Sequence, residues 1–440
     1  MSFIDKLSEK LLPLASKINN QRHLASIRDA FILTMPLTIV ASLFILLNSV
    51  IFSNELVMQY VDLSYLGGLA NVVNNGTMGI LAILICYNIG FNLSGYYKDE
   101  YGEEIAKLNP THAGIVSLSI MFVMMPLNNV VTLADGSTEE IAGVYLQSLT
   151  SSSGLFLGML AAVIGTELFV RFSHYKKLKI KMPDDVPPAI ADSFNSLIPV
   201  VLVITIVSSI VFALERTTGL TIPELVDTII QAPLSGFVLS TAGMIFIQFI
   251  SDLLWVFGMH GSSILAPIKS APMLESLQEN MNAFQMGKEI PNIITEPFIG
   301  SFGLLGGGGN ILPLVIAIFI VSKSEQQRSV AQLGLAPSLF NIAEPVMFGL
   351  PVVMNPIFMI PAATLPAINL IIAYIATNIG LVGKTVAAAP WITPPIIQAW
   401  VSTGGNIPAA ILAALLLAMD VILYIPFVMA SNKQEQMDRT

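Results

Sequence analysis

Nine apolar runs constrain this chain more than any other feature, because each is long enough to cross the roughly 30 Å hydrocarbon core of a bilayer. They cover residues 31–52, 66–90, 113–131, 154–172, 197–214, 236–258, 298–321, 357–377 and 409–429. Only 11% of the residues are charged, whereas soluble proteins average about 25%. The sequence therefore predicts an all-α polytopic membrane protein, in contact with lipid and with no nucleic-acid partner.

The distribution of Lys and Arg predicts the topology, because these residues remain on the cytoplasmic side. The segments 53–65 and 132–150 contain neither residue type. Basic residues instead lie before the first run and after the second and fourth runs: Lys6, Lys10, Lys17, Arg22, Arg28, Lys98, Lys107, Arg171, Lys176, Lys177, Lys179 and Lys181. We therefore expect both termini in the cytoplasm. Residues 3–18 read as an interfacial amphipathic helix rather than a cleavable signal.

The stretch 333–356 is apolar enough to lie at membrane depth, but its backbone cannot form one straight helix. Four prolines interrupt it, and each removes a backbone donor: Pro337, Pro345, Pro351 and Pro356. Glu344 lies at its centre, where a carboxylate costs about 2.5–3.5 kcal/mol. We favour a re-entrant hairpin that holds Glu344 for a polar substrate. The alternative is a kinked helix in which a neighbouring side chain satisfies Glu344.

A second group of polar residues ends the run 236–258. Asp252 and Trp255 share one helical face, and His260 follows where Gly258 and Gly261 allow the helix to break. An aromatic ring beside titratable groups is typical of a sugar site. Trp255 as an interfacial residue and His260 as a helix cap are the alternative interpretation.

Charge parity requires an extra or incomplete crossing between residues 216 and 297, if Lys323 and Arg328 are cytoplasmic. The segments 262–273 and 291–298 are the candidates. We therefore expect a first re-entrant element beside His260.

The run Gly306–Gly309 interrupts the seventh apolar segment. Four glycines permit close approach of either a ligand or another helix, and both interpretations stay open. A phosphate-binding loop is disfavoured, because no strand precedes the run and no Gly-Lys-Ser/Thr motif accompanies it.

The single cysteine, Cys86, excludes a disulfide framework and a Cys-cluster metal site. Because it lies inside an apolar run, we expect a buried, inert thiol.

Glu167 and Arg171 are four residues apart, and this spacing predicts an ion pair on a helix surface.

The motifs Phe-Gly-Met-His-Gly at 257–261 and Glu-Pro-Val-Met-Phe-Gly-Leu-Pro at 344–351 carry a family resemblance. With the glycine run, they make the chain resemble the membrane IIC components of phosphoenolpyruvate-dependent sugar phosphotransferase systems. The similarity is greatest to the lactose/cellobiose/diacetylchitobiose branch, and it extends from Arg28 to Phe427.

The resemblance implies about ten transmembrane helices, two re-entrant hairpins and interfacial amphipathic helices. It implies a homodimer formed through an N-terminal bundle, residues 1–180, and a sugar site in the C-terminal half, residues 181–440. His260 and Glu344 match the residues that contact the hydroxyl to be phosphorylated. The substrate-binding set that we expect is Trp255, His260, Asn292, Gly307, Gly308, Asn341, Glu344 and Trp391. No metal or cofactor is expected.

Two departures from the family pattern bear on sugar preference. Ala343 stands where an Asn often precedes the hairpin glutamate, and Gly308 stands where a Ser often interrupts the glycines.

The resemblance also implies the partners and the reaction. The membrane subunit would import a β-linked disaccharide across the bacterial plasma membrane and position its hydroxyl. Glu344 would accept a hydrogen bond from that hydroxyl, and His260 would hold it or take its proton. The phosphoryl donor would be a separate soluble IIB subunit that is served by IIA, so that any enzymatic activity is joint.

Two other classes of function compete with this interpretation. An ion-coupled secondary transporter would carry protons or sodium on Asp252, Glu344 and Asp420. An intramembrane hydrolase would use His260 and Glu344, but no nucleophile or metal-ligand spacing accompanies them.

Overall fold

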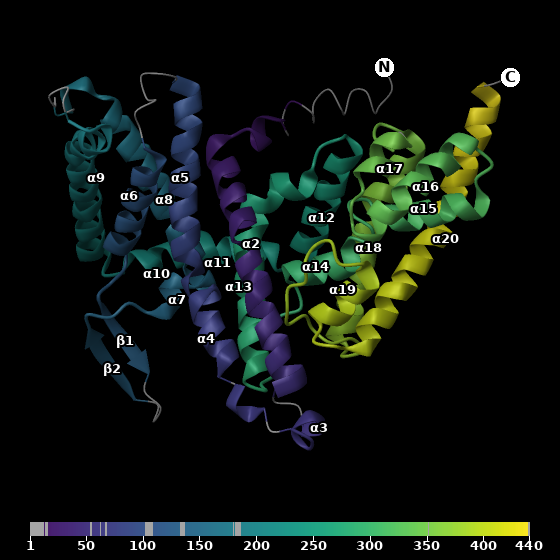
Figure 1. Ribbon diagram of the computed structural model, residues 1–440, viewed down its shortest axis with the longest axis horizontal. Helices are drawn as coiled ribbons and strands as arrows, with labels where there is room; N and C mark the ends of the chain where they lie inside the picture. Colours follow the sequence, from purple (N-terminus) through teal and green to yellow (C-terminus); the bar gives the residue numbers. More distant parts are fainter. Residues whose placement is uncertain are drawn as a thin grey trace. The chain divides into compact units, whose positions relative to one another are not determined.

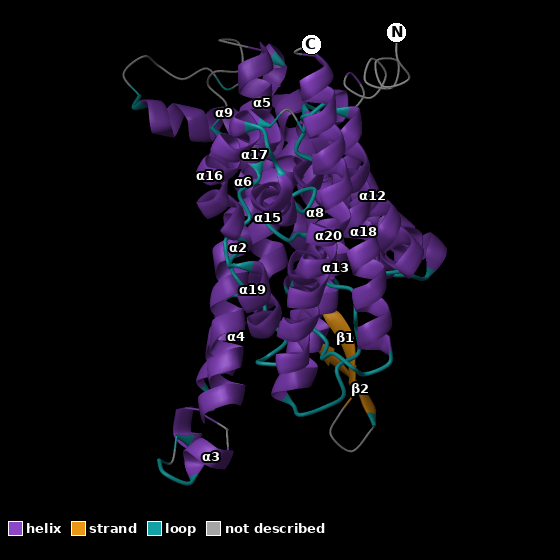
Figure 2. Ribbon diagram, turned by 90° about the vertical axis from the view of Figure 1, so that its right-hand side faces the viewer, coloured by secondary structure: helices purple, strands orange, loops and turns teal. Residues whose placement is uncertain are grey.

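The structure is a computed structural model that describes residues 13, 16–52, 55–61, 63–66, 68–101, 109–132, 137–178, 180, 186–350 and 352–438. Helices form most of the described chain, with a single two-stranded sheet among the described residues (Figure 2). Most of the expected amphipathic helix at residues 3–18, and the linker residues 181–185, lie outside this part of the chain.

Within the described residues, six helical segments are long and apolar enough to cross a membrane. They are Arg22–Leu47, Leu69–Tyr97, Ser152–His174, Ile190–Thr218, Pro356–Asn378 and Ile407–Glu435. The bent pair Ile222–Val238 and Thr241–Val256 would make a seventh, and Pro110–Met124 and Ile311–Val321 are apolar but shorter. The chain is therefore a multi-pass helical membrane protein.

The chain divides into two compact units. The first unit comprises residues 1–19, 38–73 and 235–440, and the second comprises residues 20–37 and 74–234. Three helices cross a boundary between them in the sequence: α2 (Arg22–Leu47), α4 (Leu69–Gly76) and α11 (Ala232–Val238).

The second unit is built on three helices that pack on one another, α5 (Leu81–Tyr101), α6 (Pro110–Met124) and α8 (Leu155–His174). Glycines permit the close approach: a Cβ on Gly90 would lie 2.3 Å from Ser117 Oγ, and one on Gly158 would lie 3.0 Å from Ala82 O. Cys86 is completely buried in this core, as predicted. The remaining elements are α7 (Gln147–Thr150), α9 (Pro188–Thr218) and α10 (Ile222–Val226), labelled in Figure 1.

A β-hairpin follows α6 where the sequence predicts the end of an apolar crossing. Strand β1 (Asn128–Thr132) pairs antiparallel with β2 (Thr138–Ala142). The helix stops because Pro126 disfavours the α conformation at the residue before it, and the β-branched Val130 and Val131 favour a strand. The crossing predicted over residues 113–131 is therefore too long at its C-terminal end.

The first unit holds the remaining helices. They are α3 (Glu55–Met58), α12 (Thr241–Val256), α13 (Gly261–Gln285), α14 (Glu296–Gly303), α15 (Ile311–Val321), α16 (Glu325–Leu339), α17 (Glu344–Gly349), α18 (Pro356–Asn378), α19 (Pro395–Ser402) and α20 (Ile407–Asp438). A buried apolar cluster joins α12, α15, α17, α18 and α20. The interruption predicted at the glycine run is confirmed, because it separates α14 from α15.

The segment 262–273, one of the two candidates for the first re-entrant element, lies in a long helix. It is the first half of α13, a helix of 25 residues that continues through Pro267 and Pro272. The later part of α13 is held by polar contacts to irregular backbone, since Ser276 Oγ donates to Ile294 O at 2.7 Å and Asn280 Nδ2 donates to Thr385 O at 2.8 Å.

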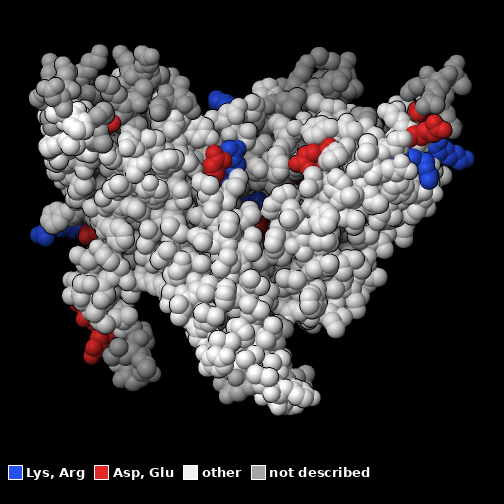
Figure 3. Space-filling view, viewed as in Figure 1, with Lys and Arg blue, Asp and Glu red and all other residues white. Residues whose placement is uncertain are grey.

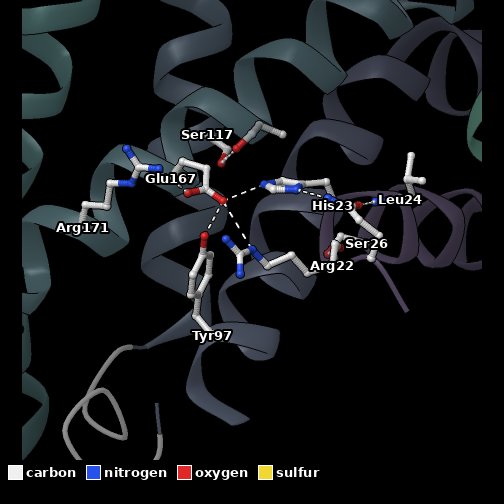
Figure 4. Close-up of polar contacts among 10 residues, drawn as sticks. Arg22, His23, Leu24, Ser26, Tyr97, Ser117, Glu167 and Arg171 are labelled. Atoms are coloured by element: carbon white, nitrogen blue, oxygen red, sulfur yellow. Dashed lines mark hydrogen bonds and ion pairs between the residues drawn. The ribbon is translucent and has the colours of Figure 1, made fainter. Parts of the chain in front are cut away.

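The carboxylate of Glu167 joins three helices of the second unit (Figure 4). Its Oε1 atom accepts hydrogen bonds from His23 Nε2 at 2.6 Å and from the hydroxyl of Tyr97. Arg22 lies 3.7 Å from the same oxygen, and Arg171 lies 3.6 Å from Oε2. The predicted pair with Arg171 is therefore present, but the stronger contacts come from α2 and α5.

The contacts of His23 define its tautomer. Gln21 Oε1 accepts the Leu24 backbone N–H at 2.8 Å, so that Gln21 Nε2 is the atom that faces His23 Nδ1 at 2.6 Å. His23 Nδ1 is then an acceptor, and the proton is on Nε2, which donates to Glu167. A neutral imidazole therefore connects the start of α2 to α8.

We expect Glu167→Ala to lower the free energy of unfolding by about 2–3 kcal/mol, because two hydrogen bonds to a largely buried carboxylate are lost. Glu167→Gln keeps an acceptor at the Oε1 position and should cost less. Thermal unfolding of the purified protein in detergent measures both. Glu139→Ala on the exposed strand β2 is the control and should change little. Equal losses for the Ala and Gln variants would contradict the acceptor role.

Candidate functional site

The glycine run forms a tight loop between α14 and α15 of the first unit. Gly306, Gly307 and Gly309 have φ angles of 90°, 94° and 75°, and Asn310 begins α15 from a φ of 52°. These left-handed conformations suit glycine, because a side chain would be strained in them. We call residues 304–310 the glycine loop.

Polar side chains hold the backbone of the glycine loop. Asn341 Oδ1 accepts the Gly306 N–H at 3.0 Å, and Asp252 Oδ1 accepts the Gly309 N–H at 3.0 Å. Asn310 Oδ1 accepts the Leu305 N–H at 2.9 Å. Backbone donors that a helix would satisfy internally are thus paired with side chains from three parts of the sequence.

Trp255 and His260 lie on one side of the glycine loop. A Cβ on Gly308 would lie 2.6 Å from the Trp255 indole, so this glycine is in direct contact with the ring. The indole is buried, and its centroid is 4.5 Å from that of the exposed His260 imidazole. Close approach at the glycine run therefore serves the packing of a tryptophan.

His260 is also the N-cap of α13. Its Nδ1 accepts the Ser263 backbone N–H at 3.2 Å and lies 2.8 Å from Ser263 Oγ. Because the backbone N–H can only donate, Nδ1 is unprotonated and the neutral ring has its proton on Nε2. His260 therefore caps α13 through Nδ1, as the alternative interpretation expected. This hydrogen bond fixes the orientation of the imidazole ring.

Glu344 lies on the other side of the glycine loop. A Cβ on Gly307 would lie 2.7 Å from Asn341 O and 2.9 Å from Ala343 Cβ, the residue before Glu344. Asn341 turns the chain from α16 toward α17 with a φ of 61°, and Glu344 is the first residue of α17. Its side chain is exposed, and within the described part of the chain its carboxylate makes no hydrogen bond or ion pair.

The glycine loop contacts one neighbour of each predicted hydroxyl contact. Gly308 touches the ring beside His260, and Gly307 touches the residue beside Glu344. Adjacent residues are only about 3.8 Å apart. The glycine loop thus connects the segment that carries the capped His260 imidazole with the segment that carries the exposed Glu344 carboxylate.

Asn341 and Trp391 belong to the same assembly. Asn341 Nδ2 donates to Trp391 O at 2.8 Å and to Thr393 O at 2.9 Å, while its Oδ1 is bonded to the glycine loop. The Trp391 side chain is 55% exposed. Asn341 thus has a scaffold role, and the ring of Trp391 is accessible.

Asn292 lies in a different set of contacts. Its Nδ2 donates to Ser276 O at 3.2 Å and to Glu279 Oε2 at 2.6 Å, and its backbone N–H donates to Asn280 Oδ1. These partners are all on α13. The described contacts therefore connect Asn292 to this helix rather than to the glycine loop.

Two buried acids, Asp252 and Asp420, have further hydrogen bonds that stabilise the glycine loop. Asp252 Oδ2 accepts from Gln248 at 2.7 Å, opposite its bond to Gly309. Asp420 Oδ2 accepts from Asn310 at 2.7 Å and from Asn369 at 2.8 Å. The four-residue spacing of Gln248 and Asp252 is a signal that sequence reasoning can use, whereas the partners of Asp420 are too distant in the chain to be found that way.

A separate cavity of about 400 Å³ lies where the end of α20 meets the segment before α18. Its lining includes Gln327, Met354, Asn355, Ser431 and Gln434. None of the predicted site residues lines this cavity. Among the described residues, no group of three or more His, Cys, Asp or Glu side chains is placed to hold a metal ion.

We expect Gly308→Ala to destabilise the first unit by about 1–3 kcal/mol, because the added methyl overlaps the Trp255 indole. The φ angle of Gly308 is not in the left-handed region, so that the substitution tests the steric contact alone. Gly95→Ala in α5 is the matched control, since nothing lies within 4 Å of its added Cβ. Thermal unfolding in detergent reports the difference, and equal melting temperatures would contradict the contact.

Known proteins are similar to this chain over most of its length. Residues 28–366 match the family profile described as Phosphotransferase system, EIIC. The chain is 33% identical to the lichenan permease IIC component of Bacillus subtilis (strain 168), with 98% of this chain and 93% of that protein covered. It is 34% identical to the cellobiose-specific EIIC component of Geobacillus stearothermophilus, with 100% and 97% covered.

A solved structure is similar over nearly the whole chain. The crystal structure of the transporter ChbC, the IIC component from the N,N'-diacetylchitobiose-specific phosphotransferase system, superimposes with a TM-score of 0.90 at 32% identity. The match covers 98% of this chain and 99% of that one. The chain therefore belongs to the EIIC family of phosphotransferase-system sugar permeases.

Proposed function

We propose that this permease imports a β-linked disaccharide of the cellobiose or diacetylchitobiose class and positions one of its hydroxyl groups for phosphorylation by a separate IIB subunit. The sugars after which its relatives are named support the sugar class, since they include lichenan, cellobiose and diacetylchitobiose. The observation that carries the proposal is that adjacent residues of the glycine loop contact Trp255, whose ring lies against His260, and Ala343, which precedes Glu344.

In this proposal Glu344 is the proton acceptor. Its exposed carboxylate has no described partner that a sugar hydroxyl would need to displace. As the hydroxyl oxygen attacks, a P–O bond forms, the bond from phosphorus to the donor atom of IIB breaks, and the hydroxyl proton passes to Glu344. Glu344 is therefore both a binding and a catalytic residue.

His260 has a different role from the one that general-base catalysis would require. Its Nδ1 lone pair accepts the Ser263 N–H, which leaves Nε2–H as the donor. We infer that His260 donates a hydrogen bond to the sugar and orients the hydroxyl toward Glu344. Of the two roles considered for His260, holding the hydroxyl is favoured over taking its proton.

Aromatic and backbone surfaces complete the proposed site. The ring of Trp391 is accessible for stacking against a pyranose, and Trp255 supports His260. Gly307, Gly308 and Asn341 shape the site through the glycine loop. Asn292 contributes at most by positioning the segment before α14, because its amide is bonded to α13.

The positions of the Lys and Arg residues support a topology, and the family resemblance supports an assembly. We infer that both termini, and the segments around Lys176 and Lys323, face the cytoplasm, where soluble IIB and IIA are found. The family resemblance supports a homodimer formed through residues 1–180, with the sugar site in residues 181–440.

Phosphorylation of the sugar during its import distinguishes this function from ion-coupled transport. Vesicles containing the protein should accumulate phosphorylated disaccharide only when phosphoenolpyruvate and the soluble subunits are present. A sodium or proton gradient alone should produce no accumulation, and accumulation of free sugar driven by such a gradient would contradict the proposal. Equilibrium binding of cellobiose, diacetylchitobiose, lichenan-derived disaccharides and lactose identifies the preferred sugar.

Glu344→Gln should weaken sugar binding by roughly 10- to 150-fold, the equivalent of a lost charge-assisted hydrogen bond of about 1.5–3 kcal/mol. Transfer from IIB should fall by a further factor of about 10²–10⁴, because the amide cannot take the proton.

His260→Gln keeps an N–H donor, so that binding and transfer should fall together by less than about tenfold. Equilibrium binding and phosphorylation with the soluble subunits measure the two effects.

Glu325→Gln is the control for this pair, because Glu325 is also an exposed glutamate that begins a helix but belongs to α16. If Glu344→Gln binds sugar as the parent does, the carboxylate has no role in recognition. A loss of transfer by His260→Gln of 10²-fold or more, with binding intact, would restore the general-base role.

We expect Cys86→Ser to retain sugar phosphorylation once expression is normalised. Cys86 is completely buried in the core of the second unit, so it cannot exchange a phosphoryl group with a soluble subunit. The measurement is phosphorylated sugar formed per mole of folded protein. Complete loss of activity in a well-folded variant would show that the single thiol takes part in transfer.

A further inference from the structure

Asp420 in α20 has an incomplete set of hydrogen bonds in a completely buried position. Its Oδ2 accepts two amide N–H groups, from Asn310 and Asn369, but its Oδ1 has no partner. Asn369 Oδ1 has none either, and both side chains are completely buried. Two unpaired oxygens thus belong to residues that are already bonded to each other.

The orientation of the surrounding groups leaves no donor for either oxygen. Asn310 is fixed, because its Oδ1 takes the Leu305 N–H and its Nδ2 must face Asp420. The Tyr424 hydroxyl, one helical turn along α20, donates to Gly309 O at 2.5 Å. The other acid on the glycine loop, Asp252, is bonded to Gly309 and Gln248.

No cation balances a negative charge at this position. Within the described residues, no Lys, Arg or His nitrogen lies within 4.0 Å of the Asp420 carboxyl. An unpaired buried carboxylate is costly, and an unpaired buried carbonyl oxygen adds to that cost. A proton on Asp420 Oδ1 would neutralise the carboxylate and provide a donor for Asn369 Oδ1.

We infer that Asp420 carries a proton on Oδ1 and donates it to Asn369 Oδ1. A neutral carboxylic acid and a primary amide then form a ring of two hydrogen bonds, with Asn369 Nδ2 donating to Asp420 Oδ2 at 2.8 Å in the other direction. Asp420 Oδ2 still accepts from Asn310. Every polar atom of the pair then has a partner.

This assignment makes Asp420 a neutral positioning residue for the sugar site. Through Asn310 it fixes the start of α15, and the preceding residues, Gly307 and Gly308, carry the contacts to Ala343 and Trp255. The alternative is an ionised Asp420 that binds a sodium ion between the two unpaired oxygens. The first assignment needs no negative charge on Asp420, whereas binding of a sodium ion requires the ionised carboxylate.

The test replaces the acid by its neutral analogue. Asn at position 420 offers an oxygen to Asn310 and Asn369 and an N–H to Asn369 Oδ1, as the protonated acid does. Asp420→Asn should therefore keep the melting temperature of the parent and bind disaccharide within about threefold of it. Asp420→Leu leaves the amides of Asn310 and Asn369 without an acceptor, and it should weaken binding about tenfold or more.

The exchange variant Asp420→Asn/Asn369→Asp adds a reciprocal test, because the ring of two hydrogen bonds survives when acid and amide trade places. It should melt within a few degrees of the parent. If Asp420→Asn behaves as Asp420→Leu does, the charge is required and the inference is overturned. Melting temperatures that rise with sodium in the parent and not in Asp420→Asn would overturn it in favour of a cation site.

Infrared spectroscopy observes the proton directly. The difference spectrum between the parent and Asp420→Asn in detergent at neutral pH should contain the carbonyl stretch of a protonated carboxylic acid. A carboxylate band in its place would overturn the inference. This readout and the melting temperatures do not involve sugar, so that they remain decisive even if the proposed sugar specificity is wrong.

Discussion

The first unit depends on satisfying irregular backbone in an apolar setting. Residues 304–310 leave the helical conformation, and their donors cannot rely on water at such burial. Asn341, Asp252 and Asn310 provide the acceptors, and Tyr424 provides a donor to Gly309 O. Because these partners come from α12, α15, α20 and the turn before α17, the same bonds that satisfy the glycine loop also assemble the elements around it.

This requirement separates the polar residues into two kinds. Asn341, Asp252 and Asp420 have their polar atoms directed at backbone or amide groups, which is the role of a scaffold. Glu344 and the ring of Trp391 are exposed. A polar residue in an apolar sequence therefore indicates a binding site only if its polar atoms are not already hydrogen-bonded within the protein.

The sequence predicts the membrane class, the position of most long helices, the burial of Cys86 and the break at the glycine run, because these follow from local hydrophobicity and backbone chemistry. It fails at the hairpin of β1 and β2, where Val130 and Val131 are as apolar as a crossing helix but favour a strand. It does not give the length of α13, where contacts at Ser276 and Asn280 hold a helix that continues beyond the candidate segment 262–273.

The partners of the intramembrane acids were beyond prediction, since Asp420 and Asn310 are 110 positions apart. Asp252 and Asp420 each anchor the glycine loop, through Gly309 and Asn310, so that a change in those bonds would disturb the loop. Of the three acids considered for ion transport, Glu344 is the one whose carboxylate has no partner in the described part of the chain, and such a carboxylate suits a subunit that holds a hydroxyl while a separate protein supplies the phosphoryl group.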